Sequence, residues 1–315
     1  QQLPIREFAG SDLAVNPVKT KAVKLTDKKK QPQITLAAEN FEVQFDRQTG
    51  FMSKYMVGGK SLLGEGGSLK PNFWRAVTDN DMGAQSQKEL KAWRTPELNL
   101  RSISADKKAK TVTAVYDMPT VKSTLTLVYQ AEENGALTIT QQLKTTPGAK
   151  VSGMLRFGMV MNLPYNMDQC QWNGRGPVEN YSDRKLSQNV GIYKSSADKL
   201  FFPYVRPQET GTMSDLRWWN QTDEGGFGFR VESDKMFSAS ALHYDLLSLD
   251  EGEEKHQRHS QSVEKSKYTN LFIDLLQQGV GGVNSWDADG RARKGHRVEY
   301  KDYTFKFRLS PKTVY

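Results

Sequence analysis

The chain has 315 residues, of which 37% are hydrophobic, 25% charged and 10% aromatic, which is ordinary for a soluble protein. No apolar run approaches the roughly 18 residues that a membrane-spanning helix requires, so we expect no membrane partner. The net charge is +8, but the basic excess lies in residues 1–30 and 291–315. It forms no single basic patch interleaved with aromatic residues, which argues against a nucleic-acid partner.

The cysteine content limits the chemistry of the chain. Its single cysteine, Cys170, excludes an internal disulfide and a cysteine-based metal site. It follows the apolar stretch that ends at Met167, so we expect a buried, unreactive thiol. The compartment stays open, because large enzymes without disulfides occur in both cytoplasm and periplasm. The first residue is Gln1 and no signal-peptide pattern follows it, so we interpret the chain as a piece of a longer polypeptide.

The first 31 residues differ from the rest of the chain. Residues 2–8 are predicted to close a strand of a preceding domain. Pro17 and the run Lys28-Lys29-Lys30 then follow with little apolar periodicity, which is typical of a lysine-rich linker. We therefore predict the end of a preceding domain and a linker in residues 1–31, and one large domain in residues 32–315.

From residue 34 onward, apolar and polar residues alternate with period two. Phe41, Val43 and Phe45 illustrate the pattern, and the following turn ends in Gly50, which is placed for positive φ. Strands at this spacing, separated by turn-forming residues, predict an all-β sandwich. The predicted strands are residues 34–36, 41–45, 51–57, 111–118, 123–130, 136–143, 151–161, 226–232, 237–242, 268–276 and 298–309.

Helix signals are few. Ser86 and Glu89 fit a capping box, which predicts a short helix that runs to about Trp93. Residues 245–257 carry three leucines and are predicted to hold a second helix. We expect both helices to decorate the sheet.

The cluster Asp79, Asn80 and Asp81 suggests two uses. These side chains could bind an oxygen-preferring cation, or fix a loop through side-chain-to-backbone hydrogen bonds. An EF-hand pattern is absent, so we favour the loop. His256 and His259 stand three residues apart, but no matching acid or cysteine gives ligand spacing, and we predict no metal site.

Residues 174–185 hold carboxylates, an arginine and a tyrosine in one compact segment. Glu179 and Asp183 could act as a general acid and base. A glycosidase pair must flank the scissile bond at about 5–10 Å, which sequence spacing cannot show. We favour a buried polar network in which Arg184 neutralises a carboxylate.

The most glycine-rich segment, residues 279–287, has three glycines within four residues and follows an apolar strand. Glycine lets another chain or a ligand approach the backbone closely, so this loop can hold Trp286 in a fixed outward pose. An indole so placed suits stacking on the apolar face of a sugar ring. The residues alone leave open whether Trp286 faces a sugar or fills the core, and core packing is the more common use.

Several segments form ordered multi-residue motifs, namely residues 45–51, 75–76 with 79–83, 174–184, 203–211 and 279–286. In this order they resemble the C-terminal domain of the large multidomain β-galactosidases of glycoside hydrolase family 2. The resemblance covers residues 34–310. It implies a large antiparallel two-sheet supersandwich, similar to galactose mutarotases, with one or two short helices.

The resemblance also implies where the chemistry lies. In the full-length retaining enzymes, the catalytic glutamates lie on a separate TIM-barrel domain, whose β/α rhythm this chain lacks. Trp286, with Ser285 and Asn284, is then expected to bind the galactoside substrate. The loop that follows Asp81 and starts at Gly83 is expected to flank the active site. Asn284 belongs to a pair that is more acidic in the family, a departure that bears on fine specificity.

The resemblance implies no cofactor in this domain, although full-length relatives often use Mg and Na. The expected partners are a galactoside, the other domains of the same polypeptide and, for the full-length protein, further copies in a homo-oligomer. The expected location is the cytoplasm or periplasm of a bacterium.

By itself, this chain is expected to be inactive. Stacking on one indole contributes about 1–3 kcal/mol, whereas catalysis requires roughly 8 kcal/mol or more. Two alternatives remain on the same fold. One is a stand-alone aldose epimerase, which would need a histidine and a carboxylate facing each other in a cleft. The other is an independent carbohydrate-binding module.

Overall fold

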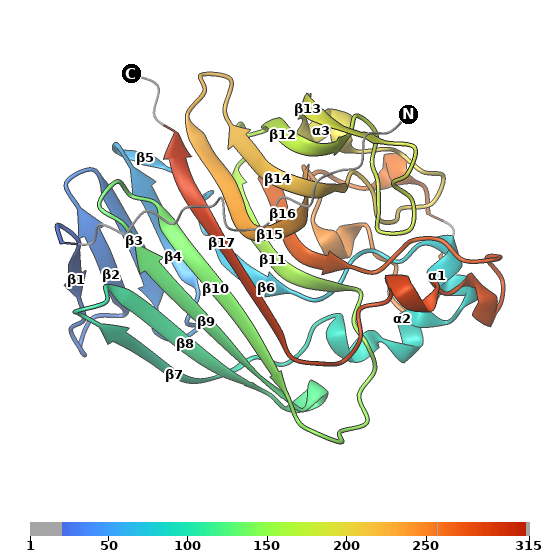
Figure 1. Ribbon diagram of the computed structural model, residues 1–315, viewed down its shortest axis with the longest axis horizontal. Coiled ribbons are helices and arrows are strands. Elements are labelled where there is room, and N and C mark those ends of the chain that lie inside the picture. Colours follow the sequence, from blue (N-terminus) through green and yellow to red (C-terminus); the bar gives the residue numbers. More distant parts are fainter. Residues whose placement is uncertain (1–20, 257, 313–315) are drawn as a thin grey trace.

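The computed structural model describes residues 21–256 and 258–312, in which seventeen strands form one continuous antiparallel sheet (Figure 1). This confirms the predicted all-β class. The strands are β1 (Lys24–Thr26), β2 (Gln33–Ala38), β3 (Phe41–Asp46), β4 (Met52–Val57), β5 (Lys60–Ser61), β6 (Leu69–Asn72), β7 (Asn99–Asp106), β8 (Thr111–Met118), β9 (Ser123–Ala131), β10 (Leu137–Thr145), β11 (Arg156–Pro164), β12 (Gln169–Gly176), β13 (Asn189–Ser196), β14 (Met213–Thr222), β15 (Gly228–Leu242), β16 (Tyr268–Gln277) and β17 (Tyr303–Lys312).

The long strand β15 joins the branches of this sheet. Residues 238–242 of β15 pair with β16, and that branch continues through β11, β6, β4, β3 and β2 to β1. Residues 228–233 of β15 pair with β17, and the second branch continues through β10, β9 and β8 to β7. A third branch runs from β15 through β14 and β12 to β13.

The first two branches face each other as two layers, and the core lies between them. Phe45 of β3 packs on Tyr129 of β9, with ring centroids 4.6 Å apart, although the two strands do not pair. Burial alternates along β8 and β9, so each strand turns one face inward. The central strand β16 differs, because residues 269–274 are buried without alternation, and both of its faces are therefore covered.

Several strand boundaries differ from the predicted ones. The two strands predicted at residues 226–232 and 237–242 are the single strand β15, and β11 begins at Arg156 rather than at residue 151. The strands β1, β5, β6, β7, β12, β13 and β14 were not predicted. β12 contains Gly174 and Gly176 among polar residues, a composition with low β-propensity, and its pairing with β13 and β14 outweighs that preference.

The helical segments also differ from the predicted ones. The helices are α1 (Asp79–Gly83), α2 (Ser86–Glu89) and α3 (Ala197–Leu200), with 3-10 turns at Lys91–Trp93, Pro119–Val121, Leu246–Ser248, Ser260–Ser262, Ala288–Gly290 and Lys294–His296. The predicted capping box at Ser86 is wrong, since Gln85 occupies the cap position with φ 56° and its side chain makes no capping hydrogen bond to α2. The capping box lies instead at Thr78 and Asp81 of α1. The helix predicted over residues 245–257 is wrong for residues 245–256, which contain only the 3-10 turn Leu246–Ser248. Gln257, the last residue of the predicted helix, lies outside the described residues.

Of the segment predicted as a linker, residues 1–31, the structure describes only residues 21–31. Within the predicted linker, Lys24–Thr26 forms β1 and pairs with β2. Residues 1–20, including the strand predicted at 2–8, lie outside the described residues, so the domain boundary stays a prediction. Burial raises the pKa of the Cys170 thiol well above its usual value, as expected for an unreactive cysteine. Over the described ranges, no helix has the length and apolar character to cross a bilayer.

Candidate functional site

The glycine-rich segment after β16, residues 279–287, forms a surface loop that we call the tryptophan loop. Trp286 is 76% exposed. The alternative that this indole fills the core is therefore wrong, and its flat faces are open to solvent. The neighbouring Ser285 is also exposed, while Asn284 is half-buried.

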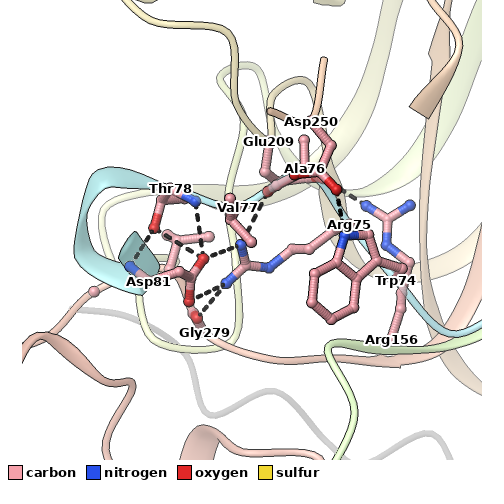
Figure 2. A network of polar contacts seen from close by, with 12 residues as sticks. Trp74, Arg75, Ala76, Val77, Thr78, Asp81, Arg156, Glu209, Asp250 and Gly279 are labelled. Carbon is pink, nitrogen blue, oxygen red and sulfur yellow. Dashed lines mark hydrogen bonds and ion pairs between the residues drawn. The ribbon is translucent and has the colours of Figure 1, made fainter. Parts of the chain in front are cut away.

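Arg75 holds the start of the tryptophan loop from inside the domain (Figure 2). Its guanidinium is fully buried and donates from Nη2 to the Gly279 carbonyl oxygen at 2.9 Å. Its Nη1 lies 2.6 Å from Asp81 Oδ2. Burial by itself would lower the pKa of Arg75, but Asp81 raises it above its usual value, so the guanidinium stays charged. Removal of only one partner of a buried ion pair strongly destabilises the fold, because the other charge is left buried without a partner.

Helix α1 supports Asp81 and carries the middle of the tryptophan loop. Thr78 Oγ1 accepts a bond from the Asp81 amide, and the Thr78 amide donates to Asp81 Oδ2 at 2.9 Å, which completes the capping box. The Asn80 side chain donates to the Asn284 carbonyl oxygen at 2.7 Å. Gly83 packs against the backbone of Ser285, where a Cβ atom would overlap with the Ser285 carbonyl group. The sequence-predicted residues of the two segments thus come together.

Asn284 fixes the local backbone around the indole. Its side-chain oxygen accepts bonds from the amides of Trp286, at 3.1 Å, and Asp287, at 3.3 Å. Its side-chain nitrogen donates to Asp287 Oδ1 at 2.8 Å. These bonds use much of the side chain's hydrogen-bonding capacity inside the loop, so its predicted contact with substrate stays a prediction.

Glu179 lies in the polar network that was predicted for residues 174–185. Its carboxylate lies 2.6 Å from Arg184 Nη2, accepts a bond from the Gly211 amide at 2.7 Å, and accepts a bond from the Tyr204 hydroxyl. Its side chain is 8% exposed. The carboxylate is thus neutralised and nearly saturated with donors, which is unsuited to a general acid or base that must reach a substrate.

The family model described as beta galactosidase small chain matches residues 37–309. The chain belongs to the β-galactosidase small-chain family.

Two relatives of this small-chain domain illustrate its extent. It is 29% identical over 302 residues to a β-galactosidase from Priestia megaterium, covering 95% of this chain and 28% of that protein. It is 31% identical over 258 residues to a β-galactosidase from Lactobacillus delbrueckii subsp. bulgaricus, covering 80% of this chain and 24% of that protein. The small-chain domain therefore spans about a quarter of the length of these curated relatives.

Solved structures confirm the mutarotase-like fold. A galactose 1-epimerase from Lactobacillus acidophilus aligns with a TM-score of 0.50 over 92% of this chain and 98% of that one. The two sequences are only 8% identical, so the likeness concerns the fold alone.

The cation site considered for Asp79, Asn80 and Asp81 does not fit the small-chain domain. Asp79 lies 2.9 Å from Arg206 Nε and 3.2 Å from Lys255 Nζ. Burial would raise the pKa of Asp79, but these two cations hold it below its usual value. In the part of the chain that the structure describes, no group of three or more His, Cys, Asp or Glu side chains could hold a metal ion.

A buried charged cluster at the start of β11 was not predicted from the sequence. Arg156 donates from Nη2 to Glu209 Oε1 at 2.9 Å, and its Nε lies 3.5 Å from Asp274 Oδ2 (Figure 2 shows Arg156 and Glu209). Burial raises the pKa of Asp274 to about 7, with Arg156 opposing and Glu209 adding to the rise. The available signal was a single aspartate inside the apolar strand β16.

Proposed function

We propose that this small-chain domain is part of a β-galactosidase and lends Trp286 to a galactoside site whose bond-cleaving carboxylates lie elsewhere in the full-length polypeptide. The observation that carries the proposal is the 76% exposure of Trp286 on a loop held by Arg75, Asn80 and Gly83. An exposed indole with a fixed backbone loses little entropy when it stacks on a sugar, which favours its use as a platform.

The proposal divides binding from bond cleavage. A galactoside has an apolar C–H face, and stacking on an indole contributes about 1–3 kcal/mol. Hydrolysis needs a barrier lowered by roughly 8 kcal/mol or more. Residues 174–185 do not offer a free pair of carboxylates, because Glu179 already binds Arg184, Tyr204 and Gly211. The domain is therefore proposed to be inactive alone.

The partners follow from this division. Under the proposal they are the galactoside, the other domains of the polypeptide and, for the full-length protein, further copies of itself. Mg and Na, which the full-length enzymes often use, would be held outside the described part of this chain. No step of the proposal uses a metal ion.

Hydrolysis of a chromogenic β-galactoside tests the division directly. We expect no turnover by the 315-residue chain and clear turnover by the full-length polypeptide. Turnover by the chain alone that disappears in Glu179→Gln would contradict the proposal. Calorimetric titration with lactose should show weak or absent binding to the chain alone, whereas tight binding would favour a carbohydrate-binding module.

An aldose epimerase would need an imidazole that a sugar can reach. His243 lies 4.0 Å from carboxylate oxygens of Asp168 and Asp198, but it is 1% exposed and Tyr165 stacks on its ring at 3.9 Å. This cover argues against the epimerase. Polarimetry with fresh α-galactose tests it, and we expect no acceleration of mutarotation by the chain.

A further inference from the structure

Asp183 reaches the tryptophan loop from a distant part of the chain. Its Oδ1 accepts a bond from the Val280 amide at 3.1 Å, and its Oδ2 accepts one from the Gly281 amide at 2.9 Å. Gly279 makes this approach possible, because a Cβ atom at that position would overlap with the carboxylate. The bonds to a charged acceptor are stronger than bonds between neutral groups.

The carboxylate and Arg75 act on opposite sides of one peptide group. Arg75 Nη2 binds the Gly279 carbonyl oxygen, and Asp183 binds the amide of Val280, the next residue. The peptide dipole is therefore aligned between a buried cation and an anion. This arrangement fixes the first leg of the tryptophan loop, while Asn80 and Gly83 fix the second leg near Trp286.

Asp183 is itself held in a defined place. It is one of the two central residues of a tight turn, in which the Tyr181 and Arg184 backbones bond to each other at 3.2 and 2.9 Å. Arg184 binds Glu179, whose other partners include Tyr204 and Gly211. The turn is thus tied to the neighbouring segment, and Asp183 transmits that position to the tryptophan loop.

We infer that Asp183 is a positioning residue for Trp286, setting the pose in which the indole meets the sugar, an inference that rests on the proposed function. Its carboxylate binds backbone amides rather than substrate, so it is not a catalytic residue. The acid or base role considered for Asp183 from the sequence is replaced by this one.

The first test measures geometry in the 315-residue chain. The chain has six tryptophans, which give six fluorine resonances after labelling with 5-fluorotryptophan. The resonance that is missing in Trp286→Phe belongs to Trp286. We expect Asp183→Ala to shift or broaden this resonance, and Asp183→Asn, which keeps one acceptor oxygen, to have a smaller effect. Hydrogen exchange at the amides of Val280 and Gly281 should accelerate about tenfold in Asp183→Ala.

The matched control is Asp106→Asn. Asp106 also accepts two backbone amides, those of Lys108 at 2.7 Å and Ala109 at 2.9 Å, but in the turn between β7 and β8. The Asp106→Asn substitution should leave the Trp286 resonance unchanged. An unchanged resonance and unchanged exchange in Asp183→Ala would overturn the inference.

The second test uses the kinetics of the full-length polypeptide. We expect Asp183→Ala to raise KM for a β-galactoside about tenfold with a smaller effect on kcat, and to have little further effect in a Trp286→Ala background. If Trp286→Ala alone leaves kcat/KM unchanged, the proposed function fails. If Trp286→Ala lowers kcat/KM but Asp183→Ala does not, the positioning role fails and the proposed function stands.

Discussion

Position 83 requires a glycine because the backbone of residues 285 and 286 packs directly against it. The Ser285 carbonyl group and the Trp286 amide occupy the space that a side chain at position 83 would need. At Gly295, by contrast, an added Cβ atom would point into open space.

We therefore predict that Gly83→Ala moves the tryptophan loop and lowers the free energy of unfolding by about 1–3 kcal/mol, as in other overpacked sites. Gly295→Ala should leave it within about 0.5 kcal/mol of the unsubstituted chain. Urea denaturation of both variants checks this. Equal stabilities would show that the contact between Gly83 and Ser285 is easily relieved.

Asp274 gives the fold a pH dependence of known sign. Burial, helped by Glu209 and opposed by Arg156, raises its pKa from the usual 3.8 to about 7. Between these values the folded protein keeps a proton that the unfolded chain releases. The contribution of Asp274 to the free energy of unfolding therefore falls as pH rises from 3.8 to about 7.

Asp274→Asn should remove this contribution, because the amide resembles the protonated carboxyl and does not titrate. We expect the variant to gain stability relative to the unsubstituted chain as pH increases through this range. Urea denaturation at several pH values measures the difference. A constant difference between the two proteins across the range would contradict the assignment.

Helix α1 is short, so its caps matter more than its length. Its backbone hydrogen bonds are supplemented by the Thr78 hydroxyl, which accepts from the Asp81 amide at 3.2 Å and donates to Asp81 Oδ2 at 3.0 Å. The same carboxylate binds Arg75, so the cap also orients the group that holds the tryptophan loop.

We predict that Thr78→Val, which keeps the shape but removes the hydroxyl, lowers the free energy of unfolding by about 1–2 kcal/mol. Thr78→Ser should retain most of the stability. Thermal denaturation of the two variants provides the measurement. If serine is as destabilising as valine, the methyl packing of Thr78 matters and its hydrogen bonds do not.

The elements that sequence could predict are those with strong local patterns. Strands such as β8 and β9 alternate clearly, and the motif residues include both Gly83 and the Ser285 backbone that packs against it. The capping box was misplaced because Ser86 matches the usual pattern, whereas Thr78 uses an aspartate at the third position. The contact of Asp183 with Val280 joins residues almost one hundred positions apart, and no local pattern encodes such a pair.

The whole molecule depends on β15, which belongs to every branch of the sheet. Most of the buried hydrophobic residues of the described chain also form one core cluster. A domain joined in this way has no internal boundary across which one part could unfold while the rest stays packed.

We therefore predict a single cooperative unfolding transition. Hydrogen exchange in increasing urea should show β2–β4 and β12–β14 opening at the same denaturant concentration. Separate transitions for these two regions would contradict the prediction and would place an independent folding unit at the β12–β14 branch.

The kinetics of Trp286→Ala in the full-length polypeptide test whether the indole is a substrate platform. We expect kcat/KM for a β-galactoside to fall roughly 10- to 100-fold. Trp218→Ala, which removes an indole that packs on Arg230 at 4.4 Å, serves as the control and should change kcat/KM little. An unchanged kcat/KM in Trp286→Ala would show that the indole is not a platform for the substrate.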